Sequence, residues 1–94
     1  MNKRILLLLC LLILGSQVFG FEEEDLDKFL RTNQCFNCDL ALADLTGMNL
    51  SKASLSEADL FGVKLSNADL SEADLVRVNL IEADLSQTNL RDAD

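Results

Sequence analysis

The sequence predicts an all-β repeat fold, a stack of short coils that a short N-terminal α-helix covers at one end. Three observations support this prediction. Leucine recurs at every fifth position from Leu40 to Leu90, the segment before Leu40 has the one-sided apolar pattern of a helix, and the first twenty residues have the features of a removable leader.

The leader has the three parts of a secretory signal peptide. Two basic residues come first, an apolar run covers residues 5–14, and residues 18–20 are small or of modest size, which places the first mature residue at Phe21. The run is about ten residues long, whereas a membrane-spanning helix needs about twenty. We therefore predict that residues 1–20 are a signal peptide and that membrane contact is limited to this segment before cleavage. The periplasm, the thylakoid lumen and the extracellular space are all compatible with this prediction.

The predicted mature chain is strongly acidic. Residues 1–20 contain two of the eight basic residues and none of the sixteen acidic ones, which leaves six basic and sixteen acidic side chains and a formal charge of −10. Nucleic acids and anionic membrane surfaces would repel this charge. We therefore expect neither of them to be a partner.

A helical cap is predicted over residues 21–37. Leu26, Phe29 and Leu30 recur on one side of a helix, acidic residues stand at its start and basic residues near its end. This order of charges suits the helix dipole, and the single apolar stripe suits a helix with one buried face. We interpret the helix as a lid over the open apolar end of the first coil.

The repeat has three defining columns. Leucine occupies positions 40, 45, 50, 55, 60, 65, 70, 75, 80, 85 and 90, eleven in all. The residue two positions before each leucine is mostly alanine or another apolar residue, and the residue between them is mostly aspartate or asparagine. A period of five matches neither a helix nor a continuous strand, so the chain must turn once per repeat. Stacked coils would then pair their backbones and bury the leucine and alanine columns.

The tandem Ala-Asp-Leu-x-x motif resembles the pentapeptide-repeat family over residues 38–94. The resemblance implies a right-handed quadrilateral β-helix with four repeats per coil, so eleven repeats would form just under three coils. Residues 30–40 also resemble the helix and Cys-x-x-Cys cap of exported family members. The predicted domains are therefore a signal peptide at 1–20, a helical cap at 21–37 and a β-helix at 38–94.

Four repeats per coil would stack residues that are twenty apart. Two pairs of opposite charges and two pairs of like charges are then expected on the surface: Glu57 with Arg77, Lys52 with Glu72, Asp39 with Asp59, and Asp74 with Asp94. Exposed ion pairs of this kind contribute less than about 1 kcal/mol each.

One outward column departs from the polar rule and is a candidate interaction patch. Ala41, Phe61 and Ile81 would stack on one wall, with Leu42 beside the first and Val76 on the adjoining wall. Scattered apolar residues are also common on ordinary protein surfaces.

The two cysteines of the mature chain are expected to point inward. Counting back from Leu40 in steps of five places Cys35 at a leucine position and Cys38 at an alanine position. An oxidising compartment favours a disulfide that pins the lid to the first coil, and two buried thiols are the alternative. A dithiol redox function is a weaker candidate, because its chemistry needs a helix N-terminus after the cysteines and here the helix precedes them.

Composition argues against an enzyme. The chain contains no histidine and no tyrosine, so acid–base catalysis would fall to carboxylates. The repeating aspartates are interpreted instead as solvated faces and turn formers. We predict no catalytic residue, metal or cofactor, and we expect a non-enzymatic exported module that acts structurally or by binding an unknown protein. Some members of the family mimic DNA and inhibit type II topoisomerases, which is the alternative that the resemblance implies.

The end of the sequence carries one further expectation. Asp94 stops one residue before the next expected leucine, so the last coil would lack a polar cap. Either two such ends meet in a homodimer, or the sequence is a fragment of a longer repeat protein.

Overall fold

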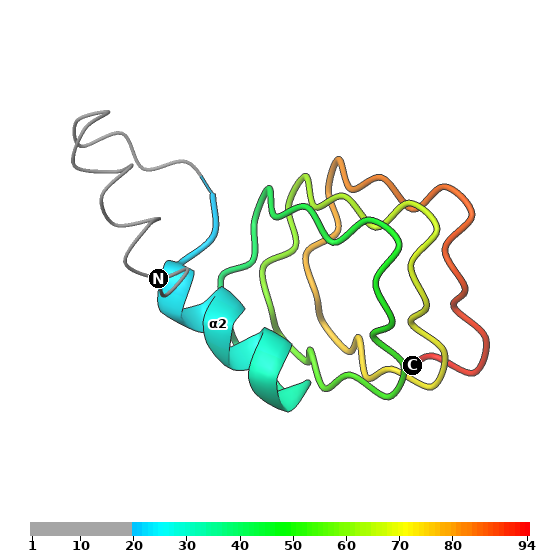
Figure 1. Cartoon of the computed structure of the whole chain (residues 1–94), viewed down its shortest axis with the longest axis horizontal. Helices are drawn as coiled ribbons and strands as arrows, with labels where there is room; N and C mark the ends of the chain where they lie inside the picture. The colour runs from blue at the N-terminus through cyan, green and yellow to red at the C-terminus, as the bar shows by residue number, and fades with distance from the viewer. Residues whose placement is uncertain (1–19) are drawn as a thin grey trace.

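The computed structural model describes residues 20–94 (Figure 1). The predicted signal peptide lies outside the described residues, apart from Gly20. The described part consists of one helix, α2 (Glu23–Thr32), followed by a stack of coils that winds away from it. It contains no helix that is both long enough and apolar enough to span a membrane.

The predicted helix corresponds to α2. Its first turn contains Glu23, Glu24 and Asp25, and its last turn contains Arg31, which matches the order of charge favoured by the helix dipole. The helix ends at Thr32. The next residue, Asn33, still donates its N–H to the carbonyl oxygen of Phe29, and its positive φ of 61° turns the chain out of the helix.

The buried face of α2 is narrower than the sequence pattern predicted. Phe29 is 1% exposed and Leu26 packs partly against the core, but Leu30 is 49% exposed. Phe29 is therefore the main apolar contact between the helix and the coils.

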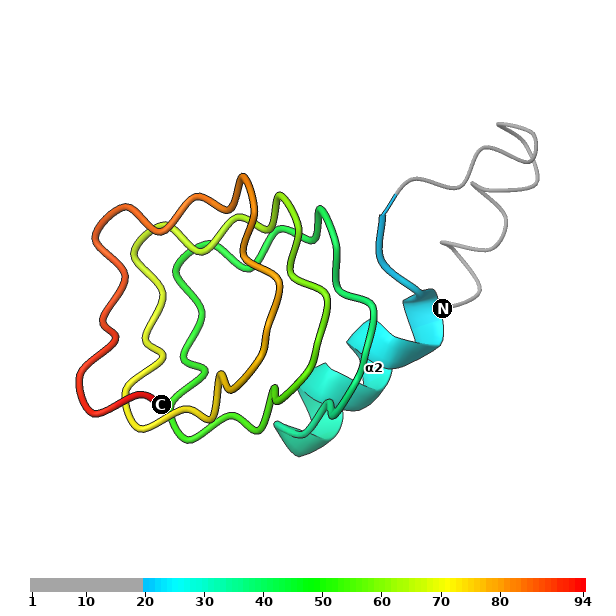
Figure 2. The same cartoon turned by 180° about the vertical axis from the view of Figure 1, so that it is seen from behind.

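The coils pair in parallel at an interval of twenty residues, as the sequence analysis predicted. Each pairing is a single-residue bridge centred on the middle residue of a repeat, so the extended pieces are very short (Figure 2). The eight bridges are Gln34–Ser54, Asp39–Asp59, Asp44–Lys64, Asn49–Asp69, Ser54–Asp74, Asp59–Asn79, Lys64–Asp84 and Asp69–Asn89. The first coil thus begins at Gln34, directly after the helix.

One complete repeat, residues 58–62, shows how the backbone is satisfied. The N–H groups of Leu60 and Gly62 donate to carbonyl oxygens of the following coil, and that of Asp59 donates to the preceding coil. Ala58 N–H donates across the corner to Leu55, and Phe61 N–H donates to the side chain of Asp59. All five N–H groups are paired. A chain with so little regular strand needs this pairing, because unpaired buried backbone groups destabilise a fold.

Every corner has the same backbone conformation. The second residue after each leucine or leucine equivalent has a positive φ, between 55° and 71°: Asn37, Leu42, Gly47, Lys52, Glu57, Gly62, Asn67, Glu72, Arg77, Glu82, Gln87 and Asp92. A turn with positive φ at its third residue favours glycine or asparagine, so the other residue types are held there by the coil above and below.

The core consists of the predicted inward columns. The leucines from Leu40 to Leu70 are at most 4% exposed, and the alanine column from Ala43 to Ala73 is buried with them apart from Met48, which is 36% exposed. Leu75, Leu80 and Leu85 are only partly buried, and Leu90 is 39% exposed. Burial therefore decreases from the helix-covered end toward Asp94.

The two corner glycines give a matched pair of substitutions. Gly47→Ala and Gly62→Ala each place alanine at positive φ, which costs roughly 1–2 kcal/mol. At Gly47 nothing lies within 4 Å of the added Cβ, whereas at Gly62 the Leu42 Cδ2 atom lies 2.5 Å away. We predict that urea unfolding shows a larger loss of stability for Gly62→Ala, and that adding Leu42→Ala to both variants removes the difference. Equal losses in the single variants would contradict the contact with Leu42.

Candidate functional site

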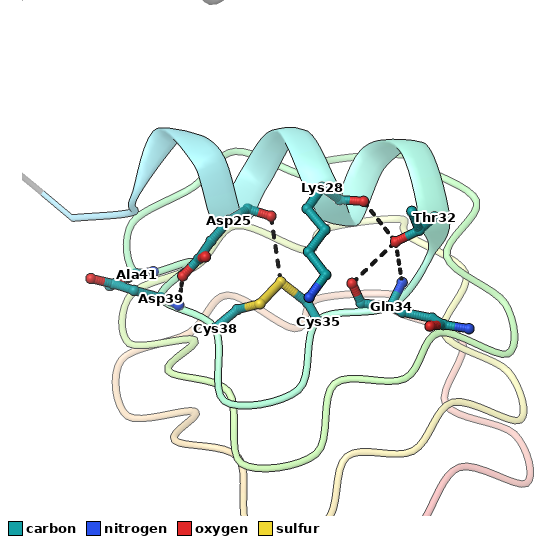
Figure 3. Close-up of a disulfide and its surroundings, with 8 residues drawn as sticks. All are labelled: Asp25, Lys28, Thr32, Gln34, Cys35, Cys38, Asp39 and Ala41. Atoms are coloured by element: carbon teal, nitrogen blue, oxygen red, sulfur yellow. Dashed lines mark hydrogen bonds between the residues drawn. A yellow bond between two sulfur atoms is a disulfide. The ribbon is translucent and has the colours of Figure 1, made fainter.

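The cysteine pair lies directly beneath α2 (Figure 3). Cys35 and Cys38 are joined in a disulfide with a Cα–Cα distance of 5.2 Å, and they are 0% and 5% exposed. The β-turn from Cys35 to Cys38 has the same form as the corners of the repeat, with the Cys38 N–H donating to the Cys35 carbonyl. Both residues occupy the inward positions that the sequence pattern predicted.

The helix takes the place of a preceding coil for the first wall. In later coils the N–H of the middle residue donates to a carbonyl oxygen twenty-one residues earlier, as Asp59 does to Cys38. For Asp39 the acceptor is instead the Asp25 carboxylate, at 2.8 Å, while the Asp39 carbonyl accepts the Glu22 N–H at 3.0 Å. The Cys35 sulfur lies 3.4 Å from the Asp25 carbonyl oxygen. These contacts define α2 and the disulfide as a structural cap.

The described residues offer no arrangement typical of a catalytic or metal site. Within residues 20–94, no group of three or more metal-ligating side chains lies together. A shallow hollow on α2 is lined only by charged side chains of that helix, namely Glu24, Asp25, Asp27, Lys28 and Arg31. An open hollow of this composition lacks the apolar lining of most ligand pockets.

The outward middle residues bind the main chain. In nine repeats, Oδ1 of the aspartate or asparagine accepts the N–H two residues further on, at 2.9–3.1 Å: Ala41, Thr46, Ser51, Phe61, Ser71, Val76, Ile81, Ser86 and Arg91. These are Asx turns, and they supply the one acceptor that stacking does not provide. Where Ser54 or Lys64 takes the middle position, no such bond forms within residues 20–94.

Three of these aspartates titrate below the ordinary value of 3.8. The first cause of the lowered pKa of Asp44, Asp69 and Asp84 is a hydrogen bond from the hydroxyl group two residues further on, and the second is the N–H of that same residue. Lys64, which stacks between Asp44 and Asp84, lowers the pKa of both further.

Asparagine and lysine reduce the number of carboxylates that stack on one another. The side-chain amide of Asn79 donates to Asp59 at 3.1 Å, and that of Asn89 donates to Asp69 at 3.3 Å. Lys64 lies between Asp44 and Asp84 and keeps these two carboxylates apart. These substitutions in the middle position leave Asp39 directly above Asp59.

One of the two predicted surface ion pairs forms. The guanidinium group of Arg77 donates to the Glu57 carboxylate at 2.8 Å. Lys52 and Glu72 make no salt bridge within the described chain.

The five residues of the predicted apolar patch are not equally accessible. Ile81, Leu42 and Val76 are 64%, 48% and 40% exposed, and Phe61 is partly buried. Ala41 is 8% exposed with Gly20, the last residue of the predicted signal peptide, lying against its carbonyl group. Sequence reasoning overlooked Phe36, which is 62% exposed. Phe36 directly follows a leucine-equivalent residue, as Val76 does, and it belongs to the same wall as Val76.

The parallel pairing at intervals of twenty residues and the inward leucines define a repeat β-helix. The family described as Pentapeptide repeats matches residues 38–75 and 58–94 with eight copies, which together is more than half of the chain. The chain belongs to the pentapeptide-repeat family.

A solved structure supports the same assignment. A pentapeptide repeat protein, Rfr23 from the cyanobacterium Cyanothece 51142, is similar with a TM-score of 0.52 and 34% sequence identity. The similarity covers 64% of this chain and 38% of the length of Rfr23. No curated protein matches the sequence significantly.

The buried disulfide gives a prediction about reduction. A reductant must reach a sulfur atom, and both are covered by α2, so reduction in native conditions should require the lid to open. Phe29→Ala should speed reduction by dithiothreitol at least about tenfold, since removing a buried phenylalanine side chain costs roughly 3 kcal/mol or more. Leu30→Ala, on the exposed face of the same helix, is the control and should change the rate little. The rate of reduction is measured for each chain by thiol labelling and mass spectrometry. Rapid reduction of the unmodified chain would contradict a cap that covers the sulfur atoms.

The lowered pKa values give a pH dependence. Since the carboxylates of Asp69 and Asp84 titrate lower in the folded chain than the usual 3.8, they stabilise it above that pH, and this stabilisation is lost as the pH falls through their lower folded values. Asp69→Asn with Asp84→Asn keeps an acceptor for each N–H but removes the titration. We predict that the melting temperature of this variant decreases less on acidification than that of a control with Glu72→Gln and Glu82→Gln. A parallel decrease in both variants would refute the assignment.

Proposed function

We propose that this protein is a non-enzymatic exported module that acts structurally, by presenting the walls of its β-helix to another protein. The observation that carries the proposal is that the outward polar side chains form hydrogen bonds with the main chain. Most middle residues bind the main chain through Oδ1 as Asx turns, so the fold fixes the position of these side chains and uses them for its own turns. What remains variable on the walls is the corner residues, which suits recognition.

The alternatives have less support. A dithiol redox protein needs an accessible sulfur nucleophile, and Cys35 and Cys38 are 0% and 5% exposed. A DNA-mimicking inhibitor of a topoisomerase would draw on the negative charge, but a protein with a signal peptide would be separated from that target.

Two finer features belong to the same proposal. We place the protein in an exported compartment, the periplasm, the thylakoid lumen or the extracellular space, on the basis of the leader in residues 1–20. The repeat is proposed to be a right-handed quadrilateral β-helix, and the pairing at intervals of twenty residues supports four repeats per coil. Counted from residue 38 it has just under three coils, and counted from the first bridge at Gln34 it has about three. The half-buried leucines of the last coil are compatible with a homodimer through that end.

The proposed function predicts export followed by a specific protein contact. The full chain, expressed with a C-terminal tag, should be recovered beyond the inner membrane as a form that begins at Phe21, as measured by intact-mass analysis. A photo-reactive amino acid placed at one corner of each wall, at Phe36, Ile81, Ser86 or Ser71, should cross-link to the same partner from one or two walls. Recovery of the unprocessed chain in the cytoplasm would contradict export, and the lack of any cross-link would contradict the binding role.

A further inference from the structure

The four walls of the β-helix differ in charge. One wall, formed by residues 38–42, 58–62 and 78–82 and here called the acidic-apolar wall, contains three carboxylates and no lysine or arginine. The three other walls each contain at least one cation, Lys64, Lys52 or Arg77. The side chains of the acidic-apolar wall therefore include no positive charge.

The carboxylates of this wall have capacity left for a further ligand. Asp39 and Asp59 stack on each other, and each uses Oδ1 to accept a corner N–H. Asp59 Oδ1 also accepts the Asn79 amide. Within residues 20–94, neither Oδ2 atom receives a hydrogen bond. A cation between the two would relieve the repulsion of the stacked charges.

An apolar surface lies beside these carboxylates. Ile81 is 64% exposed, Leu42 is 48% exposed, and the Leu42 side chain lies over Gly62, with its Cδ2 atom 2.5 Å from where a Cβ would be. Phe61 is partly exposed and belongs to the coil that lies between the coil of Leu42 and the coil of Ile81. On the next two walls the equivalent corner positions are mostly hydroxyl residues: Thr46, Ser66, Ser86, Ser51 and Ser71.

We propose, on the basis of the function proposed above, that the acidic-apolar wall is the docking surface for a polypeptide segment in which a basic side chain stands next to an apolar one. The basic side chain binds the Oδ2 atoms of Asp39 and Asp59, which are charge-assisted acceptors. The apolar side chain packs on Leu42 and Ile81 and removes their exposed surface from water. Charge complementarity decides the choice of occupant, because an acidic or neutral segment would leave the stacked carboxylates unpaired.

A set of three peptides tests the proposal on the full mature chain. The probe is a short labelled peptide in which lysine and leucine alternate. One control peptide has serine in place of every leucine, and the other has glutamate in place of every lysine. We expect only the lysine–leucine peptide to bind and to shift the NMR signals of the acidic-apolar wall. Equal binding of the lysine–serine peptide would show general attraction to an acidic protein and would overturn the proposal. Equal binding of the glutamate–leucine peptide would overturn it as well.

Variants locate the binding on the wall. Ile81→Ser should weaken binding of the lysine–leucine peptide about tenfold, whereas Val76→Ser on the adjoining wall should leave it unchanged. Asp39→Asn with Asp59→Asn should weaken binding by a similar factor and reduce its salt dependence, whereas Asp44→Asn with Asp84→Asn, which removes the same charge from another wall, should not. Equal losses in the test and control variants would overturn the proposal, as would competition by zwitterionic lipid vesicles.

A failure of this docking surface can be distinguished from a failure of the proposed binding function. If the exported chain cross-links to a partner through another wall and Ile81→Ser has no effect on that cross-link, the binding role stands and this surface is wrong. If the peptide binds as predicted but no wall cross-links in the compartment, the surface is right and the proposed function fails.

Discussion

The fold depends on pairing one recurring hydrogen-bond donor, the main-chain N–H of the first corner residue, which is the residue directly after each leucine. Stacking at an interval of twenty residues satisfies the N–H groups of the middle residue, the leucine and the second corner residue, and the turn itself satisfies the alanine. The remaining N–H, that of the residue directly after the leucine, has no main-chain acceptor within the described residues. An aspartate or asparagine in the middle position accepts it, as Asp59 does for Phe61 at 3.0 Å. The polar residue in the middle of the repeat pairs this donor in nine repeats, whereas Ser54 and Lys64 accept no such bond within residues 20–94.

This solution creates an electrostatic problem, because the acceptor recurs every twenty residues and stacks on itself. Three aspartates in one column would repel one another along the whole wall. The chain avoids this by alternating residue types, with Asn79 bonded to Asp59 and Lys64 between Asp44 and Asp84. Asn keeps the acceptor and removes the charge, whereas Lys64 removes the acceptor and adds the opposite charge. The pairs Asp39–Asp59 and Asp74–Asp94 lack either remedy between their members, but the wall of Asp74 contains Arg77, whereas the acidic-apolar wall contains no lysine or arginine.

Periodicity alone predicted most of the architecture, since a leucine every fifth residue requires one turn per repeat and a buried column. The helix and the inward cysteines were also predicted, because their patterns are local. Exposure at the ends was not predictable. Met48 occupies an alanine position but is 36% exposed, and Leu90 occupies a leucine position but is 39% exposed, because the repeat pattern does not encode how well each coil is covered. The Asx role of the aspartates was anticipated only as turn formation, because a specific N–H partner depends on the geometry of the corner.

The cap shows why the cysteines and the walls have different roles. A first coil has no preceding coil to accept its N–H groups, and α2 replaces one with a side-chain acceptor, Asp25, and a main-chain donor, Glu22. This replacement works only if the helix stays in place, and Phe29 together with the disulfide beneath it supplies that restraint. Exposing a sulfur for chemistry would require lifting the helix and would leave the Asp39 N–H without its acceptor. The cysteines are thus committed to the fold, whereas the corner side chains occupy the positions at which the backbone hydrogen bonds do not depend on residue type.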